Sequence, residues 1–108
     1  MELEAWLLGM FGNLERIDPL LSPENIRNGL GFDLQVIDPE TTFFHPAVQF
    51  EQVLRLANRA YGKHGDEMES IVSGITLDDM RDVVAAGRCR SFTSFLSEIQ
   101  REFDESQN

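Results

Sequence analysis

The sequence has few basic residues and many acidic ones. Nine Lys and Arg, of which Lys63 is the single lysine, stand against 19 Asp and Glu, so the formal net charge is −10 at pH 7. An acidic surface repels the phosphates of nucleic acids and the headgroups of anionic membranes. We therefore expect neither a nucleic acid nor a membrane as a direct partner.

Cysteine and long apolar segments are also scarce. Cys89 is the one cysteine, so no disulfide can form within the chain, which is typical of the reducing cytosol. An apolar run near the start is interrupted by Gly9, and no stretch approaches the roughly 20 apolar residues of a membrane span. Acidic Glu2 and Glu4 stand where a signal peptide carries basic residues. These features predict a soluble, cytoplasmic protein.

The length of 108 residues and the 42% share of hydrophobic residues suit one globular domain. At this size, folding buries about two-thirds of the surface of the extended chain. Domains typically contain roughly 100–200 residues. We expect a single acidic domain over 1–108, with a frayed tail over 105–108.

Apolar residues at helical spacing predict a mainly α fold. The expected helices cover 3–16, about two turns after Ser22, 46–61 with Gly62 as C-cap, a segment from Asp66, 76–87, and a last helix capped by Ser91. In the first helix we interpret Gly9 and Gly12 as tolerated exposed glycines, the alternative being close approach of another backbone segment. These segments predict a compact bundle of four to six helices.

Residues 32–44 have a different pattern. Phe32, Leu34 and Val36 alternate along one face, Asp38-Pro39-Glu40 has turn chemistry, and the residues after it are β-branched and aromatic. This pattern predicts one small β-hairpin packed on the helices. An extended loop with buried aromatic residues is the alternative.

No group of residues in the sequence specifies a reaction. His64 and Glu67 have i, i+3 spacing, but a tight metal site needs three or four ligands. Cys89 lies between Arg88 and Arg90, which favours a thiolate, but no motif supplies a base. We therefore expect no enzyme activity, no metal and no cofactor. A thiol-dependent enzyme or redox sensor at Cys89 is the alternative.

The acidic residues concentrate in three stretches of the chain. Their net charges are −4 between Arg27 and Arg55, −5 over 66–82 and −3 over 98–105. Like charges at i, i+4 destabilise a helix by a few tenths of a kcal/mol per pair. The pattern therefore indicates either a solubilising surface or a surface that meets a basic partner. The candidate acidic partner-binding residues are Asp66, Glu67, Glu69, Asp78, Asp79, Asp82, Glu98 and Glu102.

Aromatic residues provide two further candidate surfaces. Phe43 and Phe44 adjoin His45, and both phenylalanines are candidate partner-binding residues. The last helix carries an apolar stripe at i, i+3, i+4, i+7 and i+11, which is either core or a face for self-association or docking. The stripe consists of Phe92, Phe95, Leu96, Ile99 and Phe103.

These patterns predict a non-catalytic protein-binding protein, an acidic inhibitor or modulator of a basic partner, with a nucleic-acid-binding protein as one such partner. In size, charge and helix content the chain is similar in general type to small microbial and phage proteins such as immunity proteins, anti-CRISPR or anti-restriction inhibitors and phage assembly chaperones. That resemblance is one of type and involves no shared motif. One form of the predicted inhibition is mimicry of nucleic acid, in which carboxylates stand where phosphates would bind. The alternative is a structural or assembly protein that forms homo-oligomers through its last helix.

Overall fold

The computed structural model describes residues 3–59 and 66–106, and of residues 66, 67 and 106 only the backbone. Within these ranges the chain forms eight α-helices, one 3-10 helix and no strand. They are α1 (Leu3–Gly9), α2 (Phe11–Ile17), η1 (Pro19–Leu21), α3 (Pro23–Leu30), α4 (Pro39–Thr42), α5 (Pro46–Leu56), α6 (Asp66–Ser73), α7 (Leu77–Ala86) and α8 (Arg90–Ser106). The mainly α fold is confirmed, and the helix count exceeds the expected four to six.

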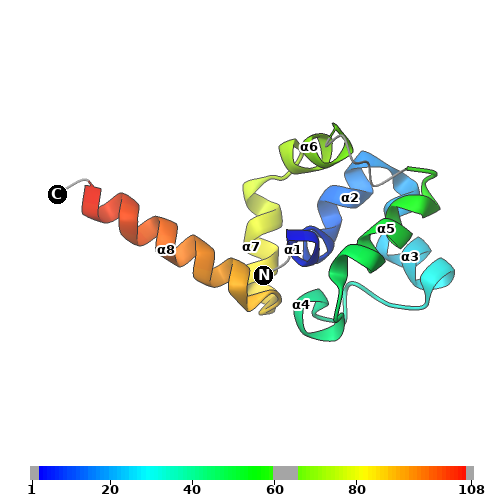
Figure 1. Cartoon of the computed structure of the whole chain (residues 1–108), viewed down its shortest axis with the longest axis horizontal. Helices are drawn as coiled ribbons and strands as arrows, with labels where there is room; N and C mark the ends of the chain where they lie inside the picture. The colour runs from blue at the N-terminus through cyan, green and yellow to red at the C-terminus, as the bar shows by residue number, and fades with distance from the viewer. Residues whose placement is uncertain (1–2, 60–65, 107–108) are drawn as a thin grey trace.

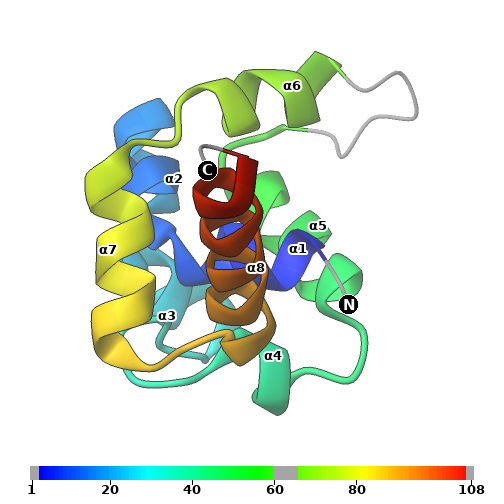
Figure 2. The ribbon, with the colours of Figure 1, turned by 90° about the vertical axis from the view of Figure 1, so that its left-hand side faces the viewer.

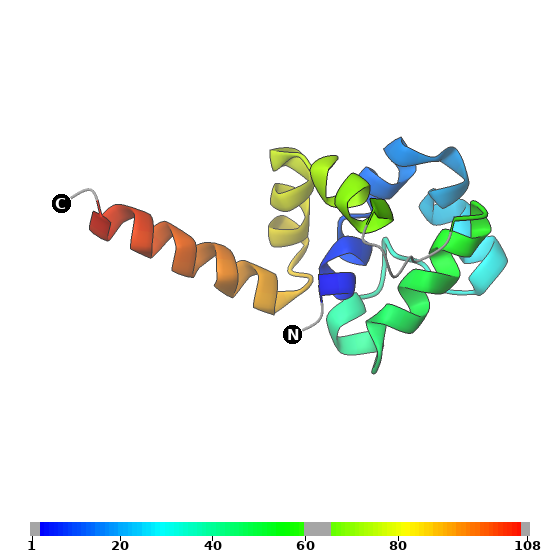
Figure 3. The same ribbon diagram turned by 45° about the horizontal axis from the view of Figure 1, so that its top comes forward.

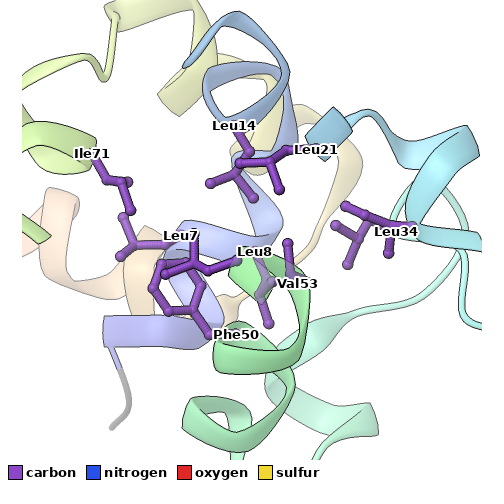
Figure 4. Packing of buried hydrophobic residues seen from close by; sticks show 10 residues of the cluster. Leu7, Leu8, Leu14, Leu21, Leu34, Phe50, Val53 and Ile71 are labelled. Carbon is purple, nitrogen blue, oxygen red and sulfur yellow. The ribbon is translucent and has the colours of Figure 1, made fainter. Parts of the chain in front are cut away.

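Helix α1 lies inside the helical body, where it packs against α4 and α5 (Figures 1 and 2). Leu7 and Leu8 of α1 point toward Phe50 and Val53 of α5 (Figure 4). Burial of one such side chain stabilises the fold by about 1.5–3 kcal/mol. The main hydrophobic core comprises Leu7, Leu8, Leu14, Leu21, Ile26, Leu34, Phe50, Val53, Leu54 and Ile71.

The single helix expected over 3–16 is two helices, with Met10 between them at φ −92° and ψ 52°. Gly9 is buried at the end of α1, and a Cβ there would lie 3.0 Å from the Sγ of Cys89. A Cβ at Gly12 would lie 3.4 Å from an oxygen of Asp79. The interpretation of Gly9 as a merely tolerated exposed residue is therefore wrong, because the side chain of Cys89 packs against it. Gly12 is half-buried, and a Cβ there would make an ordinary contact. The atoms near both glycines belong to side chains and not to the backbone of another segment.

The hairpin expected near 32–44 is not formed. The backbone turns after Asp33, whose carbonyl oxygen accepts hydrogen bonds from the N–H groups of Val36 and Ile37. Asp38 then caps α4, because its side chain accepts a hydrogen bond of 3.0 Å from the backbone N–H of Glu40. Val36 is 79% exposed, so the alternation does not mark a buried face. The residues that resemble a hairpin turn begin a short helix instead.

Two of the expected helix boundaries also differ. Helix α8 begins at Arg90, so Ser91, its expected cap, lies inside the helix. The helix expected to reach Tyr61 ends at Leu56, and Asn58 adopts a left-handed φ of 57°, which asparagine tolerates better than most residues. Tyr61 and its expected cap Gly62 lie outside the described residues. Helix α7 ends at Gly87 as expected, and this glycine has a left-handed conformation with φ 71°.

Helix α8 extends away from the body (Figures 1 and 3). Its first turn joins a second hydrophobic cluster made of Trp6, Met10, Val83, Cys89 and Phe92. The radius of gyration of 14.4 Å exceeds the roughly 13 Å of a fully compact domain of this length, because α8 lengthens the molecule to 50 Å. Among the described helices, none combines the length and the apolarity that a bilayer crossing requires.

Candidate functional site

An apolar groove with a volume of about 430 Å³ lies between α7 and α8. The two helices diverge from the short connection between Ala86 and Arg90 (Figure 3). Two of its eight lining residues, an arginine and a glutamine, have polar side chains, and the other six are apolar. The lining residues are Leu77, Met80, Arg81, Val84, Ala85, Leu96, Ile99 and Gln100.

The α7 wall of the groove consists of residues whose spacing suggests a buried face. The helical spacing of Leu77, Met80 and Val84 predicts that all three face the core, but Leu77 is 61% exposed and Val84 is 42% exposed. Val83 is the fully buried valine of α7. Neighbouring residues of a helix point about 100° apart, so turning Val83 inward turns Val84 toward the groove.

The apolar stripe of α8 is partly core and partly exposed surface. Phe92 is buried in the second cluster and Leu96 is half-buried. Phe95, Ile99 and Phe103 are exposed, with Ile99 at 48%. Only the beginning of the stripe is core, and the rest presents apolar surface to solvent.

The N-terminus of α8 is held by two carboxylates from the start of α4. Asp38 accepts a hydrogen bond of 3.1 Å from the backbone N–H of Cys89, and Glu40 accepts one of 3.1 Å from that of Ser91. The hydroxyl of Ser91 also donates to Glu40. Negative groups at a helix N-terminus satisfy free N–H groups and complement the helix dipole. These contacts set the direction in which α8 leaves the body.

Trp6 of α1 supports the same end of α8 from the side. Its ring lies 5.0 Å from that of Phe92 and 5.4 Å from that of Phe95, measured between centroids. Its Nε1–H donates a hydrogen bond of 2.9 Å to the hydroxyl of Ser91. With the base of α8 held on two sides, the groove exists before any partner binds.

The candidate acidic residues fall into exposed and buried positions. Asp79 is 4% exposed, and its predicted place on an acidic surface is wrong. The side chains of Asp66 and Glu67 lie outside the described part of the chain. The exposed candidates are Glu69, Asp78, Asp82, Glu98 and Glu102.

Asp79 links α7 to α2. It accepts hydrogen bonds of 3.1 and 2.5 Å from the guanidinium of Arg16 and one of 2.8 Å from the backbone N–H of Thr76. Burial by itself raises the pKa of Asp79, but the hydrogen bonds from Arg16 and Thr76 and the charge of Arg16 lower it overall. Asp79 therefore positions the α7 wall of the groove.

Exposed carboxylates adjoin both walls of the groove. On α7, Asp78 precedes the groove residue Arg81 by one turn and lies 3.8 Å from its guanidinium, and Asp82 follows Arg81 directly. On α8, Glu102 shares a helix face with Ile99 at i+3, and Glu98, which pairs with Arg101, precedes Ile99 directly. Besides the buried Asp79, residues 77–106 contain six acids and four arginines, so acidic residues predominate around the groove.

Phe43 and Phe44 do not form one surface. Phe43 packs edge-on against Phe32, with ring centroids 5.0 Å apart, at the margin of the main core. Phe44 is 91% exposed, and its ring lies 4.5 Å from that of His45. Neither phenylalanine lines the groove, and Phe44 is the one whose exposure suits a contact with a partner.

Cys89 joins α7 to α8 as a buried residue with a left-handed φ of 52°. Its thiol donates a hydrogen bond of 3.4 Å to the carbonyl oxygen of Ala5. Burial, followed by the charges of Asp38 and Glu40, raises the pKa of the Cys89 thiol to about 12. The expectation that its flanking arginines favour a thiolate is wrong, because these effects outweigh the charge of Arg88. The thiol is protonated at neutral pH.

Within the described ranges, no three His, Cys, Asp or Glu side chains are grouped so that they could hold a metal ion. His64 lies outside those ranges. Comparison of the chain with protein-family models, with curated proteins and with solved structures gives no significant match. Function is therefore inferred from the geometry and charge of the groove.

The groove itself was missed by sequence reasoning, because Leu77, Met80 and Val84 were assigned to the core. One signal was available in the sequence. Together with Val83 and Ala85, the apolar positions of α7 cover a wider arc than one contact with a helical body needs. A helix with so wide an apolar face has surface left for a second neighbour.

Proposed function

We propose that the chain is a non-catalytic protein-binding protein whose docking surface is the groove between α7 and α8. The observation that carries this proposal is the shared exposure of Leu77, Val84 and Ile99 around one groove. Contiguous exposed apolar surface with a polar rim is typical of sites where proteins bind one another. Burying these side chains under a partner supplies the affinity.

The charge around the groove supports a basic partner. The whole chain carries −10, and exposed acids adjoin both groove walls. Complementary charge speeds association and makes it sensitive to salt. An inhibitor or modulator of a nucleic-acid-binding protein belongs to this class, since carboxylates would occupy positions that otherwise bind phosphates.

Self-association through α8 is the second candidate function. It is favoured by the exposure of Phe95 and Ile99 on one helix. The net charge of −10 on each copy opposes it, because like charges repel when two copies approach. A basic partner gains from the same charge, and we therefore place it first.

The test is affinity capture from the source cell with three versions of the chain. The groove variant Val84→Ser/Ile99→Ser removes two exposed apolar side chains, and the control Val36→Ser removes one that is remote from the groove lining. Wild type and control should retain a basic protein that the groove variant loses. That protein should be released between about 50 mM and 500 mM salt as screening increases. Equal capture by all three versions would refute the proposed docking surface.

A further inference from the structure

We propose that the groove between α7 and α8 binds a basic amphipathic α-helix of the partner. This inference rests on the proposed function and specifies the element of the partner that docks. Three features of the groove support it: its apolar lining, the helical spacing of its two walls and the charge of its surround.

The apolar lining favours a helix over an extended segment. An extended peptide in the groove would bury backbone N–H and C=O groups that need hydrogen-bond partners. Extended peptides usually obtain those partners from the edge of a sheet, and the part of the chain that the structure describes contains no strand. The lining offers two polar side chains, those of Arg81 and Gln100. A helix satisfies its backbone internally and can bury an apolar face in this groove.

The walls have the spacing that receives another helix. Leu77, Arg81 and Val84 follow i, i+4, i+7 on α7, and Leu96, Ile99 and Gln100 follow i, i+3, i+4 on α8. Such rows form ridges between which the side chains of a packing helix insert. At 1.5 Å per residue, the row from Leu77 to Val84 is about 10 Å long. Two turns of a helix, about 11 Å, span this row with apolar residues at i, i+3 or i+4, and i+7.

The surround determines the charge of that helix. Its flanks would meet Asp78 and Asp82 on one side and Glu98 and Glu102 on the other, and lysines or arginines there would form complementary pairs. The α8 helix of a second copy has a suitable apolar face, but its 90–106 segment contains four acids and two arginines. Docking it would bring acids against acids, so a basic helix from another protein fits better.

In the experiment, three synthetic peptides of 18 residues are titrated into the isotope-labelled full chain. Binding is measured from the changes in the amide chemical shifts of the chain. The first peptide places leucines at i, i+3, i+4 and i+7 with lysines elsewhere, the second has the same composition scrambled, and the third has glutamates for lysines. The first should bind tightest, with shifts concentrated in α7 and α8. It should bind the groove variant Val84→Ser/Ile99→Ser about tenfold or more weakly, because both substitutions remove apolar side chains that the docked peptide would bury.

Controls separate helix docking from non-specific charge attraction. Val36→Ser should bind like wild type, and Asp78→Asn/Asp82→Asn should bind a few-fold more weakly with a reduced dependence on salt. The fluorescence of Trp6, beside the base of α8, verifies that each variant is folded. Leu77→Ser is a second groove variant at an exposed position. Equal binding of the first two peptides, or of wild type and both groove variants, would overturn the inference.

Failure of this inference can be told apart from failure of the proposed function. If a captured protein depends on Val84 and Ile99 while the first peptide does not bind, the function stands and the helical occupant is wrong. If capture does not depend on Val84 and Ile99, the proposed function itself is wrong, whichever peptide binds. Sedimentation that shows a dimer at high salt, lost in Ile99→Ser, would identify a second copy as the occupant and overturn the inference.

Discussion

Replacing Asp79 with alanine tests whether its link to α2 stabilises the wall of the groove. The variant loses one of the two hydrogen bonds of the capping box, the one that Asp79 accepts from the backbone N–H of Thr76, worth about 0.5–1.5 kcal/mol; the bond from the Asp79 N–H to the Thr76 hydroxyl remains. It also loses the charged hydrogen bonds that Asp79 accepts in a nearly buried position, worth about 1.5–3 kcal/mol. Arg16 is half-exposed and regains water, so the loss stays below the 3–5 kcal/mol that breaking a fully buried pair costs. We expect the free energy of unfolding to fall by about 2–3 kcal/mol.

Urea and thermal denaturation measure this effect against a matched control. Asp82→Ala removes an exposed carboxylate from the same helix and should change the free energy of unfolding by about 0.5 kcal/mol or less. For Asp79→Ala, the expected loss corresponds to a decrease in Tm of about 10–20 °C for a domain of this size. If the two variants unfold within about 0.5 kcal/mol of each other, the assignment of Asp79 as a structural link is wrong.

The lowered pKa of Asp79 adds a pH dependence to the same comparison. A carboxylate whose folded pKa lies below its unfolded value, about 3.9, stabilises the fold above that value. The contribution disappears as the pH falls through the folded pKa. The difference in unfolding free energy between wild type and Asp79→Asn should therefore shrink as the pH decreases below about 4. A difference that stays constant from neutral to strongly acidic pH would refute the lowered pKa.

Two further predictions concern the junction of α1 with α7 and α8. Cys89 should resist a small alkylating reagent at neutral pH while the chain is folded, because the thiol is buried and its pKa is raised to about 12. The same thiol should react once urea unfolds the chain. Rapid modification of the folded chain, measured by mass spectrometry, would contradict this prediction. Gly9→Ala should destabilise the fold by about 1–3 kcal/mol, because its Cβ would lie 3.0 Å from Sγ of Cys89. The double variant Gly9→Ala/Cys89→Ala should recover part of that loss in urea denaturation, and no recovery would show that the crowding lies elsewhere.

Helix boundaries were predicted best where neighbouring residues supply the capping groups. Ser22 caps α3 through the N–H of Asn25, and Thr76 caps α7 through that of Asp79. In each case donor and acceptor are three residues apart, so the sequence itself contains the complete interaction. Gly87 ends α7 for the same local reason, since glycine adopts positive φ without steric cost.

The segment around Asp38 shows why the hairpin prediction failed. Asp38-Pro39-Glu40 suits a turn between strands and equally suits the first turn of a helix. In the structure, the carboxylates of Asp38 and Glu40 bind backbone N–H groups of Cys89 and Ser91, 51 residues away in each case. Contacts over this distance are invisible to local patterns, and they favour the helical form of the segment.

Composition and periodicity by themselves determined that the chain is helical, acidic and capped at particular residues, because these properties depend on each residue and its near neighbours. Tertiary structure alone decided which faces are covered. It buried Val83 rather than Val84, and paired Asp79 with Arg16 across 63 residues. Periodicity shows which residues share a face of a helix, whereas burial depends on what packs against that face. The groove between α7 and α8 exists because the body covers only the first turns of the α8 stripe.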